Sequence, residues 1–466
     1  MHKTGLGFLF ASTELNSFRR LGLAGVIALL LSGCGSYGVI KNEPIASADT
    51  KREYSLKSYA DFGRPNDIAV ILSFSGGGTR AAAMAYGVLQ ELRDTQVTVN
   101  GTQKRLLDEV DQISSVSGGS FTAAYYGLNG ESTFETFEDA FLRKDVEGHM
   151  KWSLFRPIHW FGSKDRTQRA IEYYQKILFH DATFDQMLRP DGPFIVINAS
   201  DLATGVRWSF IQGYFDLLCS DLSSFPVANA VAASSAVPVV FNPVVIENYP
   251  DCADHQFKIS PEVRERMQTD PEMAMLYDGI QAYDDKQGHK YVFLVDGGIT
   301  DNLGLRAFSD VINVSGGPKQ YLERLHREAP SKVIFIAVDA STHGATDLGE
   351  TNRQPGILTQ VNAMADVQLH RYNAATETLV RNEIAAWAEE LSAPDRPVKA
   401  YFVEITIDSV SQPQLKLFLN KVPTSFSLTN EQVDTLIESA RSLLRDQPNY
   451  QEFLRDLSSP QALPRE

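Results

Sequence analysis

Short uncharged runs recur along the chain and alternate with longer amphipathic stretches. Five of them have the length and composition of strands buried within a sheet. They cover residues 68–74, 112–116, 194–198, 291–295 and 333–338. A sixth run, residues 400–407, alternates between apolar and polar positions and therefore predicts an edge strand. Strands that alternate with helices predict an α/β fold with a central, mostly parallel sheet and helices on both faces.

Helical patterns follow several of these runs. Residues 79–93 begin with small side chains and become amphipathic, which predicts a helix directly after the first strand. Near the end of the chain, Thr429 and Gln432 precede apolar residues at helical spacing, as in a capping box, and predict a C-terminal helical region. The segment 252–290 is polar and charged, so we expect it to be a surface insertion.

The N-terminus has the pattern of an export signal. Basic residues precede an uncharged stretch at 21–33. Its 13 residues are too few for a membrane-spanning helix, which needs about 20, but fit the apolar core of a signal peptide. The stretch ends in Leu31-Ser32-Gly33-Cys34, which resembles a bacterial lipobox. Cys34 is therefore the predicted lipidation site; an ordinary signal peptide with an incidental Cys is the alternative.

These patterns predict a signal peptide at 1–33, a polar tether at 34–65 and one folded domain at 66–466. Gly35, directly after the lipidated Cys, resembles the sorting signal of outer-membrane lipoproteins in Gram-negative bacteria. We therefore expect a lipid-anchored protein of the cell envelope that faces the periplasm.

Composition excludes several classes of protein. Of the 466 residues, 43% are hydrophobic and 22% charged, unlike disordered or low-complexity chains. A formal net charge of -15 argues against a nucleic-acid partner. The 3 Cys cannot form a disulfide framework or a four-thiolate zinc site. Cys219 and Cys252 either form one disulfide in an oxidising compartment or remain two buried thiols.

A glycine turn follows the first predicted strand. Gly76, Gly77 and Gly78 stand between this strand and the following helix. Successive glycine N–H groups can point into one space, and a helix N-terminus behind them favours negative charge. The turn is thus a candidate anion hole, although a tight turn without this function has the same sequence. It lacks the lysine and the spacing of a phosphate-binding P-loop.

Ser117 follows the second predicted strand and precedes a helix. Small residues stand two positions before and after it, Ser115 and Gly119, as the crowded turn of a nucleophile elbow requires. At a helix N-terminus the dipole would stabilise a developing alkoxide. An ordinary Ser-Gly turn is the alternative.

A third turn, Asp296-Gly297-Gly298, follows the fourth predicted strand. An acid at the carboxyl end of a buried strand lies where α/β sheets place their active sites, although Asp also caps ordinary turns. Because an anion hole, a nucleophile and a carboxylate each follow a buried strand, we expect all three at one rim of the sheet.

The order of these turns resembles the patatin-like phospholipase family. The family's G-G-G-x-R, G-x-S-x-G and D-G-G motifs appear as residues 76–80, 115–119 and 296–298. The stretches 198–205 and 232–238 also resemble the family, and the similarity extends over residues 68–340. Ser115, in place of the first motif glycine, and Gly304, in place of Pro, depart from its pattern.

The resemblance implies a three-layer patatin-like fold and a catalytic dyad of Ser117 and Asp296 without a histidine. It also implies an oxyanion hole built from four residues, Gly76, Gly77, Gly78 and Arg80. The expected substrates are phospholipid or lysophospholipid esters. We expect no cofactor and no metal, because the sequence has no calcium-binding acidic loop.

Two other functions remain open at this point. A Ser-His-Asp hydrolase would have a histidine later in the chain, and His343 is the best placed because it follows a predicted strand. From a different class, the chain could be a non-catalytic lipoprotein that binds lipid. Intact Ser117 and Asp296 argue against that possibility.

Overall fold

The computed structural model describes residues 38–45, 54–64, 67–99, 101–149, 165–238, 240–250, 261–342, 352, 354 and 356–458. Several sequence predictions therefore concern residues outside this part, namely the signal peptide 1–33, Cys34, Cys252 and His343.

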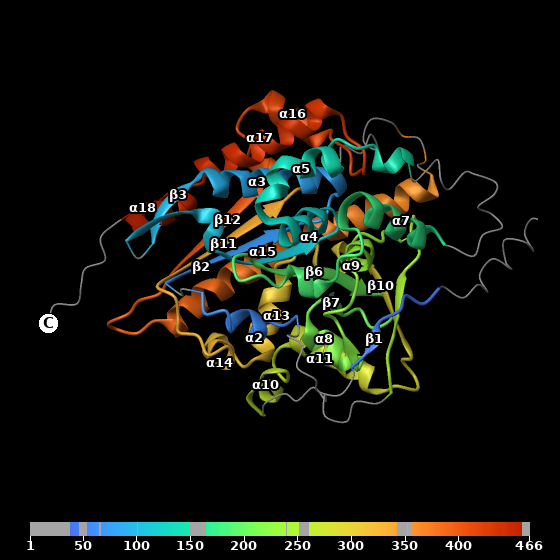
Figure 1. Ribbon diagram of the computed structural model, residues 1–466, viewed down its shortest axis with the longest axis horizontal. Coiled ribbons are helices and arrows are strands. Elements are labelled where there is room, and N and C mark those ends of the chain that lie inside the picture. Colours follow the sequence, from blue (N-terminus) through green and yellow to red (C-terminus); the bar gives the residue numbers. More distant parts are fainter. Residues whose placement is uncertain are drawn as a thin grey trace, which may run out of the picture. The chain divides into compact units, whose positions relative to one another are not determined.

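An eight-stranded sheet lies at the centre of the fold (Figure 1). Its strands are β2 (Ile68–Phe74), β5 (Val110–Val116), β6 (Phe194–Asp201), β7 (Arg207–Ser209), β9 (Val244–Glu247), β10 (Tyr291–Asp296), β11 (Lys332–Asp339) and β12 (Lys399–Thr406). The strand order is β12-β11-β2-β5-β6-β10-β9, and β7 pairs with β6 beside this path. All six runs predicted as strands belong to this sheet. Four short strands form two separate pairs, β1 (Glu43–Pro44) with β8 (Ser220–Asp221) and β3 (Gln96–Val99) with β4 (Thr102–Arg105).

The sheet is mostly parallel, as the sequence predicts. β12, β11, β2, β5 and β6 run in the same direction. β12 lies at the edge, which confirms the expectation from its alternating pattern. β10, β9 and β7 run antiparallel to their neighbours. The direction of β10 is important because this strand ends in Asp296.

Helices cover both faces of the sheet. Those within the described residues are α2 (Leu56–Ala60), α3 (Gly78–Asp94), α4 (Gly118–Asn129), α5 (Thr133–Phe137), α7 (Arg166–Tyr174), α8 (Gln212–Leu217), α9 (Val227–Ser234), α10 (Pro261–Arg266), α11 (Pro271–Gln281), α12 (Gly298–Asp301), α13 (Arg306–Val314), α14 (Pro318–Arg324), α15 (Ile357–Leu391), α16 (Pro413–Asn420), α17 (Asn430–Asp446) and α18 (Pro448–Ser458). Helices α3 and α17 lie on one side of the sheet, and α13 and α14 lie on the other (Figure 1). None of the helices in the described part is long and apolar enough to cross a membrane.

Two hydrophobic cores result from the alternation of side chains along the strands. On β11, Ile334, Ile336 and Val338 point into the larger core, which includes α3, α4 and α17. Phe335 and Ala337 point the other way, into a smaller core with residues of α13 and α15. The predicted arrangement of helices on both faces is therefore correct.

The capping box predicted at the C-terminus is present. Thr429 caps α17 and accepts a hydrogen bond from the Gln432 N–H, while the Gln432 side chain accepts from the Thr429 N–H. α17 packs so closely on α3 that a Cβ at Gly87 would lie 2.4 Å from the Ile437 carbonyl oxygen. The C-terminal helical region is thus part of the main fold.

Part of the predicted tether 34–65 also belongs to the fold. Tyr54 is fully buried, stacks on Phe194 and donates a 2.8 Å hydrogen bond to the Ile195 carbonyl. Tyr59 is also buried. The surrounding sequence is polar, so these isolated aromatic anchors give no periodic signal.

The expected surface insertion 252–290 likewise contributes to the main core. Leu276 and Ile280 of α11, with Tyr283 directly after it, are buried in the larger hydrophobic cluster. Their apolar faces are interrupted by charged residues in the sequence, which explains why the segment has a polar average.

Candidate active site

Ser117 lies at a sharp turn between β5 and α4. Its backbone has φ 48° and ψ -117°, a conformation that non-glycine residues rarely adopt. The following glycines are required by close packing: a Cβ at Gly118 would lie 2.0 Å from the Gly78 carbonyl oxygen, and one at Gly119 would lie 2.7 Å from the Phe74 Cβ. This is the geometry of a nucleophile elbow.

A chain of buried serine hydroxyls holds the elbow in place. Ser234 Oγ accepts a 2.8 Å hydrogen bond from the Ser117 N–H and donates one of 2.6 Å to the Asn198 carbonyl. Ser120 Oγ lies 2.9 Å from Ser234 Oγ and donates to Ser115 Oγ at 3.1 Å. Ser115, the departure from the motif, donates in turn to the Val196 carbonyl. The buried Ser115 hydroxyl therefore has hydrogen-bond partners, which a glycine at this position could not contact.

Asp296 lies level with Ser117, although not for the reason that the sequence suggested. The parallel-sheet rule does not apply, because β10 runs antiparallel to β6. Instead, Val116 pairs with Asn198 of β6, and Asp296 pairs with Ala199, the next residue. The register of β6 against its two neighbours thus brings the carboxylate to the end of β5.

The Ser117 and Asp296 side chains are both buried, with exposed fractions of 6% and 8%. Asp296 Oδ1 accepts a 2.8 Å hydrogen bond from the Gly298 N–H, and the Ser117 hydroxyl also hydrogen-bonds to this carboxyl. Burial raises the pKa of Asp296 to about 6, because it outweighs these two hydrogen bonds, which lower it. The carboxylate is therefore a stronger base than an exposed aspartate.

The glycine turn lies beside the nucleophile, since a Cβ at Gly76 would be 3.4 Å from the Ser117 Cβ. The Gly76 N–H, however, already donates a 3.0 Å hydrogen bond to the Asn302 carbonyl. No hydrogen bond within the described residues uses the N–H of Gly77 or Gly78 as donor. Of the glycine N–H groups predicted to form the oxyanion hole, those of Gly77 and Gly78, at the N-terminus of α3, are therefore the two available donors.

Arg80 does not take the place in the oxyanion hole that the sequence motif implied. Its Nε donates to the Ala340 carbonyl at 2.7 Å, Nη1 to the Val422 carbonyl at 2.7 Å and Nη2 to Thr424 Oγ1 at 2.9 Å. Burial lowers the pKa of Arg80 to about 10, so it stays charged at neutral pH. All three nitrogens of the guanidinium are used to tie two loops to α3, which makes Arg80 a structural residue.

Asn302 is a site residue that the sequence did not single out. Its Oδ1 lies 2.6 Å from the position of a Cβ at Gly76 and 3.1 Å from that at Gly298. The side chain thus fills the space between the glycine turn and the Asp296 loop. The only sequence signal was its place shortly after the Asp-Gly-Gly turn.

Of the remaining predicted residues, only Cys219 lies within the described part of the chain. Cys219 is disulfide-bonded, but Cys252 lies outside the described residues, so the pairing of these two stays a prediction. Cys34 and His343 lie outside them as well. Within the described ranges, no group of three or more His, Cys, Asp or Glu is placed to hold a metal ion. We refer to the three turns 76–80, 115–119 and 296–298 as the glycine rim.

Comparisons with known structures give distant matches. Human GIVD cytosolic phospholipase A2 is 12% identical, with a TM-score of 0.45 over 86% of this chain and 62% of that one. Its complex with methyl γ-linolenyl fluorophosphonate has a TM-score of 0.39 over 87% and 62% of the two chains, also at 12% identity. VipD from Legionella pneumophila is 11% identical, with a TM-score of 0.23 over 88% and 73%. The chain thus spans less than two thirds of the human phospholipase.

Sequence comparison is more specific. No curated protein matches the sequence significantly. The sequence model of the patatin-like phospholipase family matches residues 72–309, about half of the chain. This range contains all three turns of the glycine rim. The chain therefore belongs to the patatin-like phospholipase family.

Proposed function

We propose that the protein is an acyl hydrolase that cleaves ester-linked fatty acids from membrane lipids, with phospholipids or lysophospholipids as substrates. Ser117 is the nucleophile and Asp296 the general base. The observation that supports this proposal is the hydrogen bond between the Ser117 hydroxyl and a buried carboxyl with a pKa of about 6. Family membership supports the choice of lipid esters.

The reaction would proceed in two halves. Asp296 accepts the hydroxyl proton while Ser117 Oγ attacks the ester carbonyl, and the negative oxygen of the tetrahedral intermediate faces the N–H groups of Gly77 and Gly78. Its collapse breaks the ester bond, and the leaving alcohol takes the proton from Asp296. Water then repeats the sequence on the acyl-enzyme and releases the fatty acid. A base with a pKa near 6 is ionised at neutral pH and still accepts a proton readily.

Activity of purified protein on a panel of phospholipids, lysophospholipids and short chromogenic esters tests the dyad. Ser117→Ala and Asp296→Asn should each reduce fatty-acid release by about 10³-fold or more. Activity of the wild type should fall below pH 6, because protonated Asp296 cannot accept the hydroxyl proton. Ser224→Ala, at an exposed serine, is the matched control and should leave the rate unchanged.

Two results would contradict the proposal. If His343→Ala abolished activity in a folded protein, a Ser-His-Asp triad would replace the dyad. If the wild type released fatty acid from none of these esters, the chain would be a non-catalytic lipid-binding protein.

We also propose that lipidated Cys34 anchors the protein to the cell envelope, on the outer membrane facing the periplasm. With a formal charge of -15, the chain has no general attraction to anionic lipid headgroups. Mass spectrometry of the mature N-terminus should show a diacylglyceryl-modified Cys34; an unmodified or missing Cys34 would refute the anchor.

A further inference from the structure

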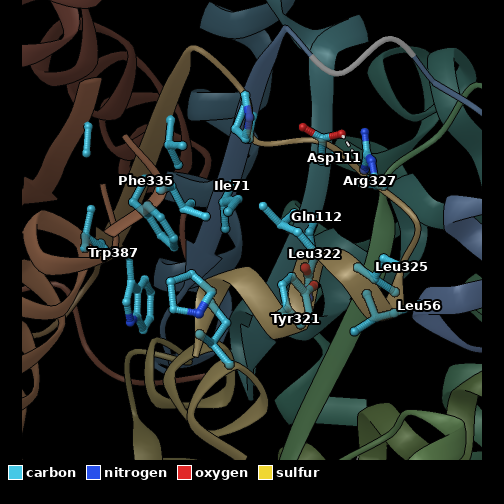
Figure 2. Close-up of a pocket in the computed structure, with 18 of the residues that line it drawn as sticks. Leu56, Ile71, Asp111, Gln112, Tyr321, Leu322, Leu325, Arg327, Phe335 and Trp387 are labelled. Carbon is cyan, nitrogen blue, oxygen red and sulfur yellow. Dashed lines mark ion pairs between the residues drawn. The ribbon is translucent and has the colours of Figure 1, made fainter. Parts of the chain in front are cut away.

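A cavity of about 130 Å³ lies at the opposite end of the sheet from the glycine rim (Figure 2). We call it the apolar pocket. Its floor is the beginning of the sheet strands, with Ala69 and Ile71 of β2 and Val333 of β11, and its walls include residues of α2, α14 and α15. It belongs to the smaller of the two hydrophobic cores, on the face covered by α13, α14 and α15.

The pocket is a place where this core is incompletely filled. Ile71, Val333 and Trp387 are only partly buried, whereas Val70, Leu72 and Ile334 on the other face are fully buried. Apolar side chains in contact with solvent at a concave surface are unfavourable unless something covers them. The pocket therefore offers a binding surface for an apolar group.

One end of the pocket is charged. Arg327 Nη1 lies 3.8 Å from Asp111 Oδ1, and Figure 2 shows this pair at the opposite end from Phe335 and Trp387. Asp111 is further engaged, because Oδ2 accepts a 3.0 Å hydrogen bond from the Val70 N–H. Arg327 Nη2, in contrast, is buried without a hydrogen-bond partner among the described residues. A buried donor of this kind is costly to leave unpaired.

The charge balance at this end favours an anion. Burial raises the pKa of Asp111 to about 6, although the positive charges of Arg64 and Arg327 act against this rise. The neighbouring Glu109 is paired with Lys104 at 2.8 Å. One acid thus faces two guanidinium groups, so this end has an excess of positive charge. Arg327 lines the pocket, and a small rotation of its side chain would turn the unpaired Nη2 toward a negatively charged oxygen there.

The apolar pocket is separate from the proposed active site. Gln112, which lines it, stands five residues before Ser117, or about 16 Å along the strand. The turn Leu303-Gly304-Leu305 occupies the sheet face between them, because Ser73 and Ser114 donate their hydroxyl hydrogen bonds to the Leu303 and Gly304 carbonyls. An acyl chain attached at Ser117 cannot reach the pocket across this turn.

We infer that the apolar pocket binds a straight-chain fatty acid, with its carboxylate on Arg327 and its chain along Ile71 toward Trp387. The apolar lining, the elongated arrangement and the single free cationic donor together match a monocarboxylate with an alkyl tail. The cavity of about 130 Å³ is comparable in size to an engineered apolar cavity of about 150 Å³ that binds benzene, so a short-chain acid such as hexanoate is the best probe. This inference does not depend on the proposed hydrolysis.

Calorimetric titration of the full-length Ser117→Ala protein with hexanoate tests the inference, because this variant cannot form an acyl-enzyme with the ligand. We expect saturable binding that Ala388→Phe, which fills the pocket, weakens at least tenfold. Arg327→Met should weaken hexanoate binding at least tenfold but hexanol binding by less than threefold, since hexanol has no carboxylate. Arg327→Lys keeps a positive charge and should restore part of the affinity.

Arg396→Met is the matched control, because this exposed arginine pairs with Glu328 outside the pocket and should leave hexanoate binding unchanged. Thermal unfolding of each variant verifies that it is folded. Absence of saturable hexanoate binding would overturn the inference, as would binding that Ala388→Phe does not affect, which would place the fatty acid at the active site instead. Self-association of the protein that Ala388→Phe abolishes, without hexanoate binding, would overturn the inference and assign the pocket to a second copy of the chain.

Discussion

The glycine rim and the apolar pocket lie at opposite ends of one sheet and are packed very differently. At the rim, backbones approach so closely that a Cβ at Gly118 would be 2.0 Å from a carbonyl oxygen, and hydroxyls of three serines form a continuous chain. At the pocket, Ile71 and Trp387 are only partly buried and Arg327 Nη2 has no partner within the described chain. The rim has no room for additional side-chain atoms, whereas the pocket does.

This difference follows from what each end has to hold. Acyl transfer needs a nucleophile, a base and oxyanion donors fixed before the substrate arrives, so rigid close packing supports the proposed chemistry. A pocket that binds an alkyl chain by burial alone needs only an apolar surface and one charged group. Substitutions that add the same small volume at the two ends should therefore have opposite effects.

The largest effect is expected for Gly118→Ala. The new methyl group would overlap the Gly78 carbonyl oxygen, so either the elbow or the oxyanion turn must move. A displacement of about 1 Å costs about 100-fold in rate, and forced overpacking costs about 3 kcal/mol of stability. Fatty-acid release and urea unfolding measure the two effects.

Gly213→Ala is the control for this substitution, because nothing lies within 4 Å of the position of its Cβ, in α8. It should keep full activity and gain about 0.5–1 kcal/mol. If Gly118→Ala behaved like this control, the close packing of the rim would not be essential for its geometry.

The second effect concerns the buried carboxylate at the rim. Because the pKa of Asp296 is raised from 3.8 to about 6, the folded protein binds the proton more tightly than the unfolded chain. Stability should therefore fall as the pH rises from about 4 to 6, by up to about 3 kcal/mol. Asp296→Asn cannot ionise, so it should be more stable than the wild type above pH 6, and this advantage should disappear below pH 4.

Urea unfolding of the wild type and of Asp296→Asn at several pH values measures this difference directly. A difference that does not change with pH would show that ionisation of Asp296 costs no stability. The inactive variant would then resemble any other core substitution, and the rim would not trade stability for its proposed function.

The smallest effect is expected when the same substitution, Ala→Val, is made near each end of the sheet. Ala69→Val adds two methyl groups next to the apolar pocket, where β2 has room, and should stabilise the protein by about 0.5–1 kcal/mol. Ala82→Val adds them to a fully buried position in α3 near the rim and should destabilise it by about 1–3 kcal/mol. Thermal unfolding provides the test, and equal effects at both positions would remove the proposed difference in packing.

Much of the fold could be predicted from local patterns. The six uncharged or alternating runs are strands of the central sheet, and Thr429 with Gln432 form the predicted capping box. The buried Tyr54 and the buried face of α11 were missed, because single aromatic anchors and interrupted apolar faces give no clear periodicity.

The sequence by itself determined the elements and the chemical groups of the candidate site, since helix and strand periodicity, caps and glycine turns depend on residues close together in the chain. Only the tertiary structure decided how these groups meet. The register of β6 places Asp296 beside Ser117 despite the antiparallel direction of β10. Contacts with residues far along the chain occupy the Gly76 N–H and turn Arg80 away from the oxyanion hole. Such contacts depend on which distant segments pack together, and no local pattern records that choice.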